Sequence, residues 1–354
     1  MSENRELFNT YIATGVELSL ASARNATRGL SEADRQQAWH TLSYALAIEN
    51  PLPAAGELLL VLSPKMVQAG YWREWIPYLE QGLRCVSALD DLVMAAELSL
   101  HLGHLYQRLG QLDRADRYAE EAEWRFAFLD NRCRQSAALN RQAEIARGRR
   151  DFSAVEHLTN RALDLSAAES GAGADPDVDM EEQCHAFLIK GRSAFNQQNW
   201  SLAGQHFETA LSIYEQTENL SRSAVCIQNQ GRVRTMEGDY DGAIADFRQA
   251  IRLLADINDV FNLAAVCMNL GIVYSLDGRS YDALEQYAQA ERVFRRLDDR
   301  IHLAKNLNNQ GMEMNNLERW IEAEQLLKAS SALALQMDNL QEYINAQDSL
   351  GLTY

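Results

Sequence analysis

The sequence predicts an all-α protein, built as a right-handed superhelical solenoid of antiparallel helix pairs. Three observations predict this fold: a frame of small residues recurs with a period of about 40 residues, apolar residues recur at spacings of three and four, and the 354 residues include only 5 prolines. Apolar spacings of three and four place side chains on one face of an α-helix, whereas proline interrupts helices. A single helix pair cannot bury its own apolar face, so such repeats stack on one another.

The recurring frame reads Gly–x6–Gly–x4–Ala–x6–Ala and is complete where it begins at Gly103, Gly231 and Gly271. We expect the first glycine to let the two helices of a hairpin approach closely, and the second glycine to end the first helix. The two alanines are expected on the face of the second helix that the first helix contacts. Six of the seven steps between successive frames are equal to the step from Gly231 to Gly271, and the step from Ala143 to Gly191 is longer.

The frame divides the chain into repeat units and flanking segments. We expect a divergent N-terminal helical cap at residues 1–53 and three repeat units at 54–167. An acidic linker or inserted loop containing glycine and proline follows at 168–182. Four more units are expected at 183–339, and the first helix of an incomplete repeat at 340–354. Because that last helix lacks a partner, we expect the chain to belong to a longer protein, and its open end could mediate self-association. A natural end at which one helix caps the array is the alternative.

Composition narrows the classes of partner. The chain has 33 basic and 50 acidic residues and a net charge of −17, which disfavours binding to nucleic acid or to an anionic membrane. The longest apolar run, Leu58 to Leu62, is too short to span a bilayer. Five cysteines without a CxxC pair indicate a reducing compartment, so we predict a cytoplasmic protein. Abundant arginine with only four lysines suggests a bacterial, GC-rich genome.

No motif for catalysis or for a cofactor is evident. The sequence lacks a glycine-rich phosphate loop, an HExxH pair and a GxSxG elbow. His101 and His104 have the spacing of a metal pair, but the pattern supplies no third ligand, and the adjacent Cys184 and His185 are not thereby a catalytic pair. The segment Trp72–Trp75 (WREW), at a turn and the start of a second helix, is expected to pack as a wedge rather than to form a site. We therefore predict no catalytic residue, no metal and no cofactor.

The segment Asn269-Leu270-Gly271 with Tyr274 carries the clearest family signature. The pattern resembles the tetratricopeptide repeat in its long variety, the variety of the Leu-Gly-Asn adaptors of spindle orientation, kinesin light chains and the sensor arms of bacterial maltose-type activators. The resemblance covers roughly residues 55–354 and is specific for the fold rather than for the function. The sequence departs from the usual glycine or tyrosine of this pattern at five positions, which are Ala143, Gln198, Arg234, Met314 and Glu318.

The resemblance implies that the first helices of the pairs line a concave surface that binds a ligand. Residues at offsets of −6, −3, −2, +1, +4 and +5 from the first glycine share one helical stripe and should face it. The predicted peptide- or partner-binding residues on this stripe are His104, Arg141, Arg192, Gln228, Asn229, Arg232, Met268, Asn269, Lys305, Asn308, Asn309 and Met312.

Charge and side-chain amides distinguish this stripe. It carries six Lys or Arg against two Glu, which favours an acidic or carboxylate-bearing ligand; the alternative is a solvated helix face. Asn229, Asn269 and Asn309 recur at one offset, and an amide can both donate to and accept from an extended peptide backbone, as asparagine does in the adaptors that the pattern resembles. The alternative is that these asparagines tie one hairpin to the next. Met268 and Met312 fit either an adaptable apolar floor or the core.

These observations predict a protein without catalytic activity that binds an acidic protein or peptide segment in its groove. The alternative is a regulatory or sensor arm of a larger bacterial effector. Such an effector would be a signal-transduction ATPase, a transcription regulator or a caspase-like protease, with its active domain outside these residues.

Overall fold

The computed structural model describes residues 2–25, 32–48, 53–69, 71–167, 176–216, 219–257, 259–297, 299–336 and 340–353. All regular structure in these ranges is α-helical, which confirms the predicted all-α class. None of the helices described there combines the length and the apolar character that a bilayer-spanning segment needs.

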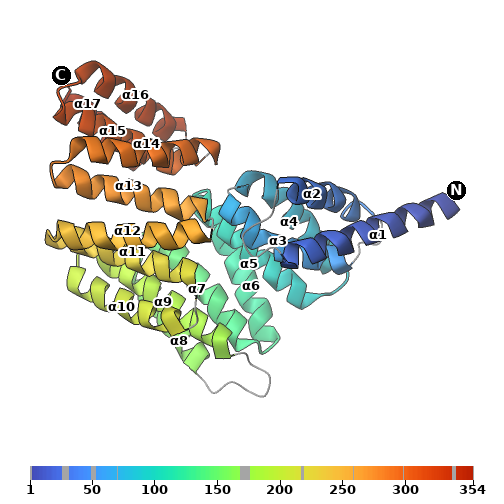
Figure 1. The fold of residues 1–354 in the computed structure, drawn as a ribbon. Helices are drawn as coiled ribbons and strands as arrows, with labels where there is room; N and C mark the ends of the chain where they lie inside the picture. Colours follow the sequence, from blue (N-terminus) through green and yellow to red (C-terminus); the bar gives the residue numbers. More distant parts are fainter. Residues whose placement is uncertain are drawn as a thin grey trace. The chain divides into compact units, whose positions relative to one another are not determined.

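The helices belong to two compact units, residues 1–197 and 198–354. Figure 1 labels the helices of the first unit, which are α1 (Ser2–Asn25), α2 (Glu32–Ala45), α3 (Pro53–Ala69), α4 (Trp72–Ser87), α5 (Leu92–Arg108), α6 (Leu112–Phe128), α7 (Arg132–Gly148), α8 (Phe152–Ala167) and α9 (Pro176–Asn196). The helices of the second unit are α10 (Trp200–Gln216), α11 (Leu220–Glu237), α12 (Tyr240–Asp256), α13 (Val260–Leu276), α14 (Ser280–Arg296), α15 (Arg300–Asn316), α16 (Trp320–Gln336) and α17 (Leu340–Gly351).

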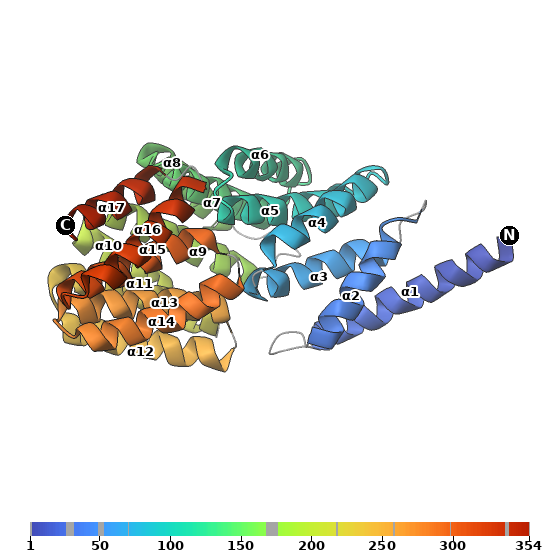
Figure 2. The same cartoon turned by 90° about the horizontal axis from the view of Figure 1, so that it is seen from above.

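Consecutive helices pack as antiparallel hairpins, and the hairpins stack within each unit. In the first unit, contacts link each helix from α3 to α9 with the next, and in the second unit they run unbroken from α10 to α17. Figure 1 and Figure 2 both show α13, α14 and α15 lying side by side. Large side chains such as Phe247 and Tyr287 fill the hairpins and are at most 2% exposed. The predicted array of stacked helix pairs is therefore confirmed.

An asparagine or aspartate caps most first helices at the same register position. In each case the side-chain Oδ1 accepts a hydrogen bond from the backbone N–H three residues later, which satisfies a donor that the helix itself leaves unpaired. These caps are Asp91, Asn131, Asn219, Asp259 and Asp299. Because the cap occupies one position of the repeat along most of the array, these first helices all begin at the same point of their repeats.

The turn inside each hairpin keeps one backbone conformation even where its residue type changes. Gly110, Gly238 and Gly278 have φ values of 73°, 83° and 76°, as expected for glycines that end a helix. The residues at the equivalent positions of the repeat are Arg150, Gln198 and Glu318, and their φ values are 61°, 62° and 59°. The sequence departs from glycine at these three positions, but the left-handed backbone conformation persists.

We expect Gly271→Ala to lower the free energy of unfolding by about 1–3 kcal/mol, the usual cost of overpacking. A Cβ at Gly271 would lie 2.5 Å from the ring of Tyr287, which is 2% exposed and has no room to move. Urea denaturation measures the effect. Gly204→Ala is the matched control, because its Cβ would lie 3.8 Å from Val233; the helix propensity of alanine should stabilise that variant by up to about 1 kcal/mol. Equal effects of the two substitutions would contradict the close approach at Gly271.

The predicted linker at residues 168–182 requires a correction. Residues 168–175 lie outside the described residues, whereas residues 176–182 form the first turns of α9. Pro176 is the first residue of α9, and proline is favoured at the first position of a helix, where its missing N–H leaves no bond unmade. The two compact units divide after Gln197 instead of within this segment.

Candidate functional site

The predicted binding residues lie on the first helices of the hairpins. We call α5, α7 and α9 the first face and α11, α13 and α15 the second face; within each face, every helix contacts the next one. Three of the predicted residues are on the first face, namely His104, Arg141 and Arg192. The other nine, from Gln228 to Met312, are on the second face.

A buried carboxylate organises the first face. Glu144 of α7 is 4% exposed and accepts hydrogen bonds from Arg147, at 2.8 Å, and from Arg192 of α9, at 2.9 Å. Burial alone would raise the pKa of Glu144, but the charges of Arg147 and Arg192 outweigh it and hold this pKa well below its usual range. Arg192, which we predicted to contact a ligand, is therefore engaged by a carboxylate of the protein itself.

Sequence reasoning missed a second carboxylate of the first face, Glu182 of α9. The Nδ2 of Asn140 donates to both the backbone oxygen and Oε2 of Glu182, each at 2.9 Å, and Nδ1 of His185 lies 3.8 Å from the same Oε2. Burial would raise the pKa of Glu182, but His185 and Asn140 lower it further than burial raises it. Glu182 was assigned to the linker, and the helix-starting role of proline is the signal that could have placed it on α9.

The remaining predicted residues of the first face also have partners. The Nε2 of His104 accepts from Arg108 at 3.2 Å, and Arg141 donates to Oε1 of Gln107 at 2.7 Å. Burial and two nearby arginines lower the pKa of His101 to about 4, so this imidazole is neutral at pH 7. The described part of the chain contains no cluster of three or more His, Cys, Asp or Glu that could hold a metal.

The three asparagines of the predicted ladder differ in their contacts. Asn229 is 3% exposed; its Nδ2 donates to the backbone oxygen of Val225 at 2.7 Å, and its Oδ1 accepts from Arg232 at 3.0 Å. Asn269 and Asn309 are half-buried, and their amides form no hydrogen bond with any described residue. One amide of the ladder is therefore engaged near its own helix, and two are available.

Asn308 adds an unsatisfied carbonyl to the second face. It is 9% exposed, its Nδ2 lies 3.6 Å from Sδ of Met312, and its buried Oδ1 has no hydrogen-bond partner in the described ranges. A buried acceptor left without a donor costs about 1–3 kcal/mol, so this carbonyl is a local cost to stability on the second face. Met312 is 44% exposed, whereas Met268 is 9% exposed and belongs to the core.

Polar side chains complete the second face. Nζ of Lys305 lies 3.6 Å from Oε1 of Glu342 on α17, and Arg232 donates to Asn229 as described above. Gln228 of α11 is half-buried and forms no hydrogen bond with the described residues. The second face is thus rich in amides, and its two cations lie beside groups of the same unit.

Two known family profiles match the chain. A family profile described as tetratricopeptide repeat matches residues 96–123, which the structure folds as most of the α5–α6 hairpin. The chain is a tetratricopeptide repeat protein. A second profile, described as soluble NSF attachment protein, matches residues 178–329 of this tetratricopeptide repeat protein. Comparison with curated protein sequences gave no significant match.

Solved structures share the fold of this tetratricopeptide repeat protein at low sequence identity. A Rap protein complexed with competence and sporulation factor is 14% identical, with a TM-score of 0.59 and 98% of each chain covered. The Rap conjugation gene regulator of plasmid pLS20 in complex with the Phr* peptide is 13% identical, with a TM-score of 0.56 and 97% and 96% of the two chains covered. A signal transduction ATPase from Pyrococcus horikoshii with a tetratricopeptide repeat sensor is 11% identical, with a TM-score of 0.55; 90% of this chain and 52% of that chain are covered.

Proposed function

We propose that the second face binds an extended peptide segment of another protein and catalyses no reaction. The observation that carries this proposal is the pair of available amides, Asn269 and Asn309, at the same position of two adjacent first helices. Packed helices lie about 8–10 Å apart, which is the length of about three residues of extended chain. The two amides are therefore spaced to bind backbone groups three residues apart, each donating and accepting at once.

A further observation supports a peptide ligand. The two Rap proteins that share this fold over nearly their whole length were both solved with a bound factor or peptide.

We further propose that the bound segment carries carboxylates. Among the nine predicted residues of the second face, Arg232 and Lys305 are cations and none is an acid. A positively charged binding surface favours an acidic ligand. The affinity for such a ligand should fall as salt is added.

The test starts from a displayed library of extended peptides, selected on the whole chain. We expect the double variant Asn269→Ala/Asn309→Ala to bind a selected peptide about 10- to 100-fold more weakly, because two hydrogen bonds of about 0.5–1.5 kcal/mol each are lost. Fluorescence polarisation of the labelled peptide measures this, and circular dichroism checks that helicity is unchanged.

A control variant removes two amides elsewhere in the same hairpins. Gln286 of α14 and Gln325 of α16 form no hydrogen bond with any residue in the described ranges and lie on second helices, so Gln286→Ala/Gln325→Ala should bind as the wild type does. If the asparagine variant binds equally well, or if no peptide is selected, the second face is not the binding surface.

A sensor arm of a larger protein is the second candidate function. The similarity to the P. horikoshii ATPase supports it, because this chain aligns with 52% of a protein whose repeats are described as a sensor. The peptide-binding face would then bind the sensed ligand, and a domain outside these residues would respond to that binding. We place the protein in the cytoplasm, which is supported by its five cysteines, because none of them forms a disulfide in the described part of the chain. Self-association through α17, which exposes Leu340 and Ile344, is tested by light scattering across a concentration series.

A further inference from the structure

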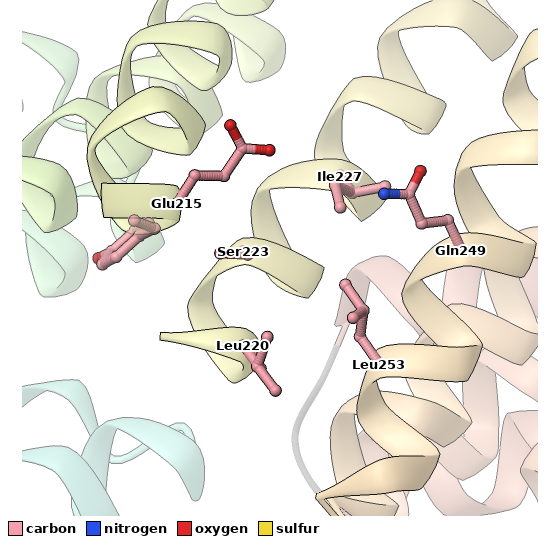
Figure 3. A pocket seen from close by; sticks show the side chains of 7 residues that line it. Glu215, Leu220, Ser223, Ile227, Gln249 and Leu253 are labelled. Carbon is pink, nitrogen blue, oxygen red and sulfur yellow. The ribbon is translucent and has the colours of Figure 1, made fainter. Parts of the chain in front are cut away.

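A pocket of about 380 Å³ lies in the second unit, on the side of α11 opposite to the second face. Ser223 is nine residues from Arg232, and nine residues at 100° each place the two half a turn apart around the helix. Figure 3 shows α10, α11 and α12 surrounding the pocket. Its lining residues are Tyr214, Glu215, Leu220, Ser223, Ile227, Gln249 and Leu253. A volume of this size is in the range of sites for small ligands.

The pocket exists because one hairpin has a small residue where later hairpins have a large one. At the register position of Ser223, the next two repeats have Leu263 and Leu303, and Leu303 is 6% exposed. A leucine at these positions packs between neighbouring hairpins. Serine at the same register position leaves that space open beside α11.

Ser223 presents its hydroxyl to the pocket. The residue as a whole is 6% exposed, and its Oγ forms no hydrogen bond with any described residue. Serines within helices commonly donate to the carbonyl four residues earlier, as Ser63 does to Leu59 at 2.8 Å, but Ser223 does not. Its Oγ is not enclosed by protein atoms, so it can donate to or accept from a ligand in the pocket.

The rim of the pocket has polar groups on two sides. In Figure 3, Glu215 extends from α10 and Gln249 extends from α12, and both side chains point into the space between the helices. Neither forms a hydrogen bond with a described residue. Among the described residues that line the pocket, Glu215 is the one that carries a charge, which favours a positively charged ligand. The apolar wall is provided by Leu220, Ile227 and Leu253.

We propose that this pocket binds a primary ammonium group attached to an aliphatic body of about the size of a leucine side chain. The aliphatic body packs against Leu220, Ile227 and Leu253. The ammonium group donates to the carboxylate of Glu215 and to Oγ of Ser223, and Oε1 of Gln249 supplies a further acceptor. Free aliphatic amines and the N-terminus of a peptide that begins with leucine share this chemistry. The site is separate from the peptide-binding face and does not depend on it.

Leucinamide is the probe, titrated into the whole chain with labelled leucine and isoleucine methyl groups. We expect the methyl resonances of Leu220, Ile227 and Leu253 to shift on addition. Acetyl-leucinamide has the same aliphatic body without the charge, so it should bind at least about 10-fold more weakly. A peptide that begins with leucine is the third arm: tighter binding of this peptide assigns the site to a peptide N-terminus, and tighter binding of leucinamide assigns it to a free amine.

Two variants decide between a binding site and an unused gap. Ser223→Leu should abolish the shifts by filling the pocket and should keep the fold, because Leu263 and Leu303 occupy this position in later hairpins. Glu215→Gln should weaken leucinamide about 10-fold and leave acetyl-leucinamide unchanged. Ser201→Leu, an equal substitution at an exposed position of α10, is the matched control. The proposal is overturned by an absence of shifts in the wild type, by equal binding of the acetylated probe, or by shifts that survive in Ser223→Leu.

Discussion

Replacing Trp75 by alanine is expected to lower the free energy of unfolding of the first unit by about 3–5 kcal/mol, the largest effect of any single substitution considered for this protein. The Trp75 side chain is fully buried, and its Nε1 donates to Oγ of Ser63 at 3.0 Å. Its ring meets Trp39 edge to face at 5.9 Å and stacks on Tyr78 at 5.7 Å. The substitution therefore removes a large apolar surface and one hydrogen bond at the same site.

The measurement is urea denaturation followed by far-ultraviolet circular dichroism, with hydrogen exchange to show that the loss is in α3, α4 and α5. Trp124→Ala is the matched control. Trp124 is 60% exposed and stacks only on Phe128, which is 69% exposed, so its removal should cost less than about 1 kcal/mol. Similar losses for the two tryptophans would show that Trp75 does not act as the expected packing wedge.

Glu144→Gln is expected to lower the free energy of unfolding by about 3 kcal/mol at neutral pH. The substitution keeps the shape of the side chain but leaves Arg147 and Arg192, whose side chains are 26% and 27% exposed, without their shared carboxylate. Removing one partner of a buried ion pair leaves an uncompensated charge, at a cost of about 3–5 kcal/mol. The partial exposure of both arginines places the expected value at the lower end.

The same substitution should change how stability depends on pH. Because the folded-state pKa of Glu144 is lowered, its contribution is fully present above the unfolded pKa of glutamate, about 4.3, and is lost as pH falls towards the folded value. The difference between wild type and Glu144→Gln should therefore shrink between about pH 6 and about pH 3. Urea midpoints across this range measure it.

Asp113→Asn provides the comparison for Glu144. Asp113 is 96% exposed and pairs with Arg149, which is 38% exposed, at 2.9 Å, and an exposed pair of this kind contributes about 0.2–1 kcal/mol. If Glu144→Gln is as mild as Asp113→Asn and its effect does not vary with pH, then the buried carboxylate does not organise the first face.

The hairpin array could be predicted from the sequence because the frame repeats in the same register. Gly271 and Ala283 mark the same close approach that the structure shows between α13 and α14. The turn residues were harder to interpret. Glu318 departs from the pattern, yet it adopts the left-handed conformation of the glycines, because packing of α15 against α16 fixes the turn and a single non-glycine residue can tolerate it.

The binding surface could be predicted only as a set of helix positions. Periodicity places Asn229, Asn269 and Asn309 on one stripe, but it cannot show that Arg232 engages the first of them and that no described side chain engages the other two. Nor does it show that Glu144 already binds Arg192. Hydrogen-bond partners depend on side chains one turn or one helix away, and the spacing of a repeat contains no information about their rotamers.

The pocket beside Ser223 was not predicted, and the reason is physical. A search for repeats looks for the residues that make contacts, such as Phe247 and Tyr287. A pocket arises from a side chain that is smaller than its counterparts. The register comparison of Ser223 with Leu263 and Leu303 is the signal that could have found it.

Because each helix packs mainly on its neighbours in the stack, the repeats of this protein can diverge in sequence separately. Within each unit, the main contacts of a described helix are with helices one or two places away along the chain, so a substitution in one hairpin affects its neighbours and has little effect further away. A duplicated hairpin can therefore acquire a new specificity while the others keep theirs. The side chains of one repeat can therefore change independently of those in the others, and Ser223 is an example of such a change.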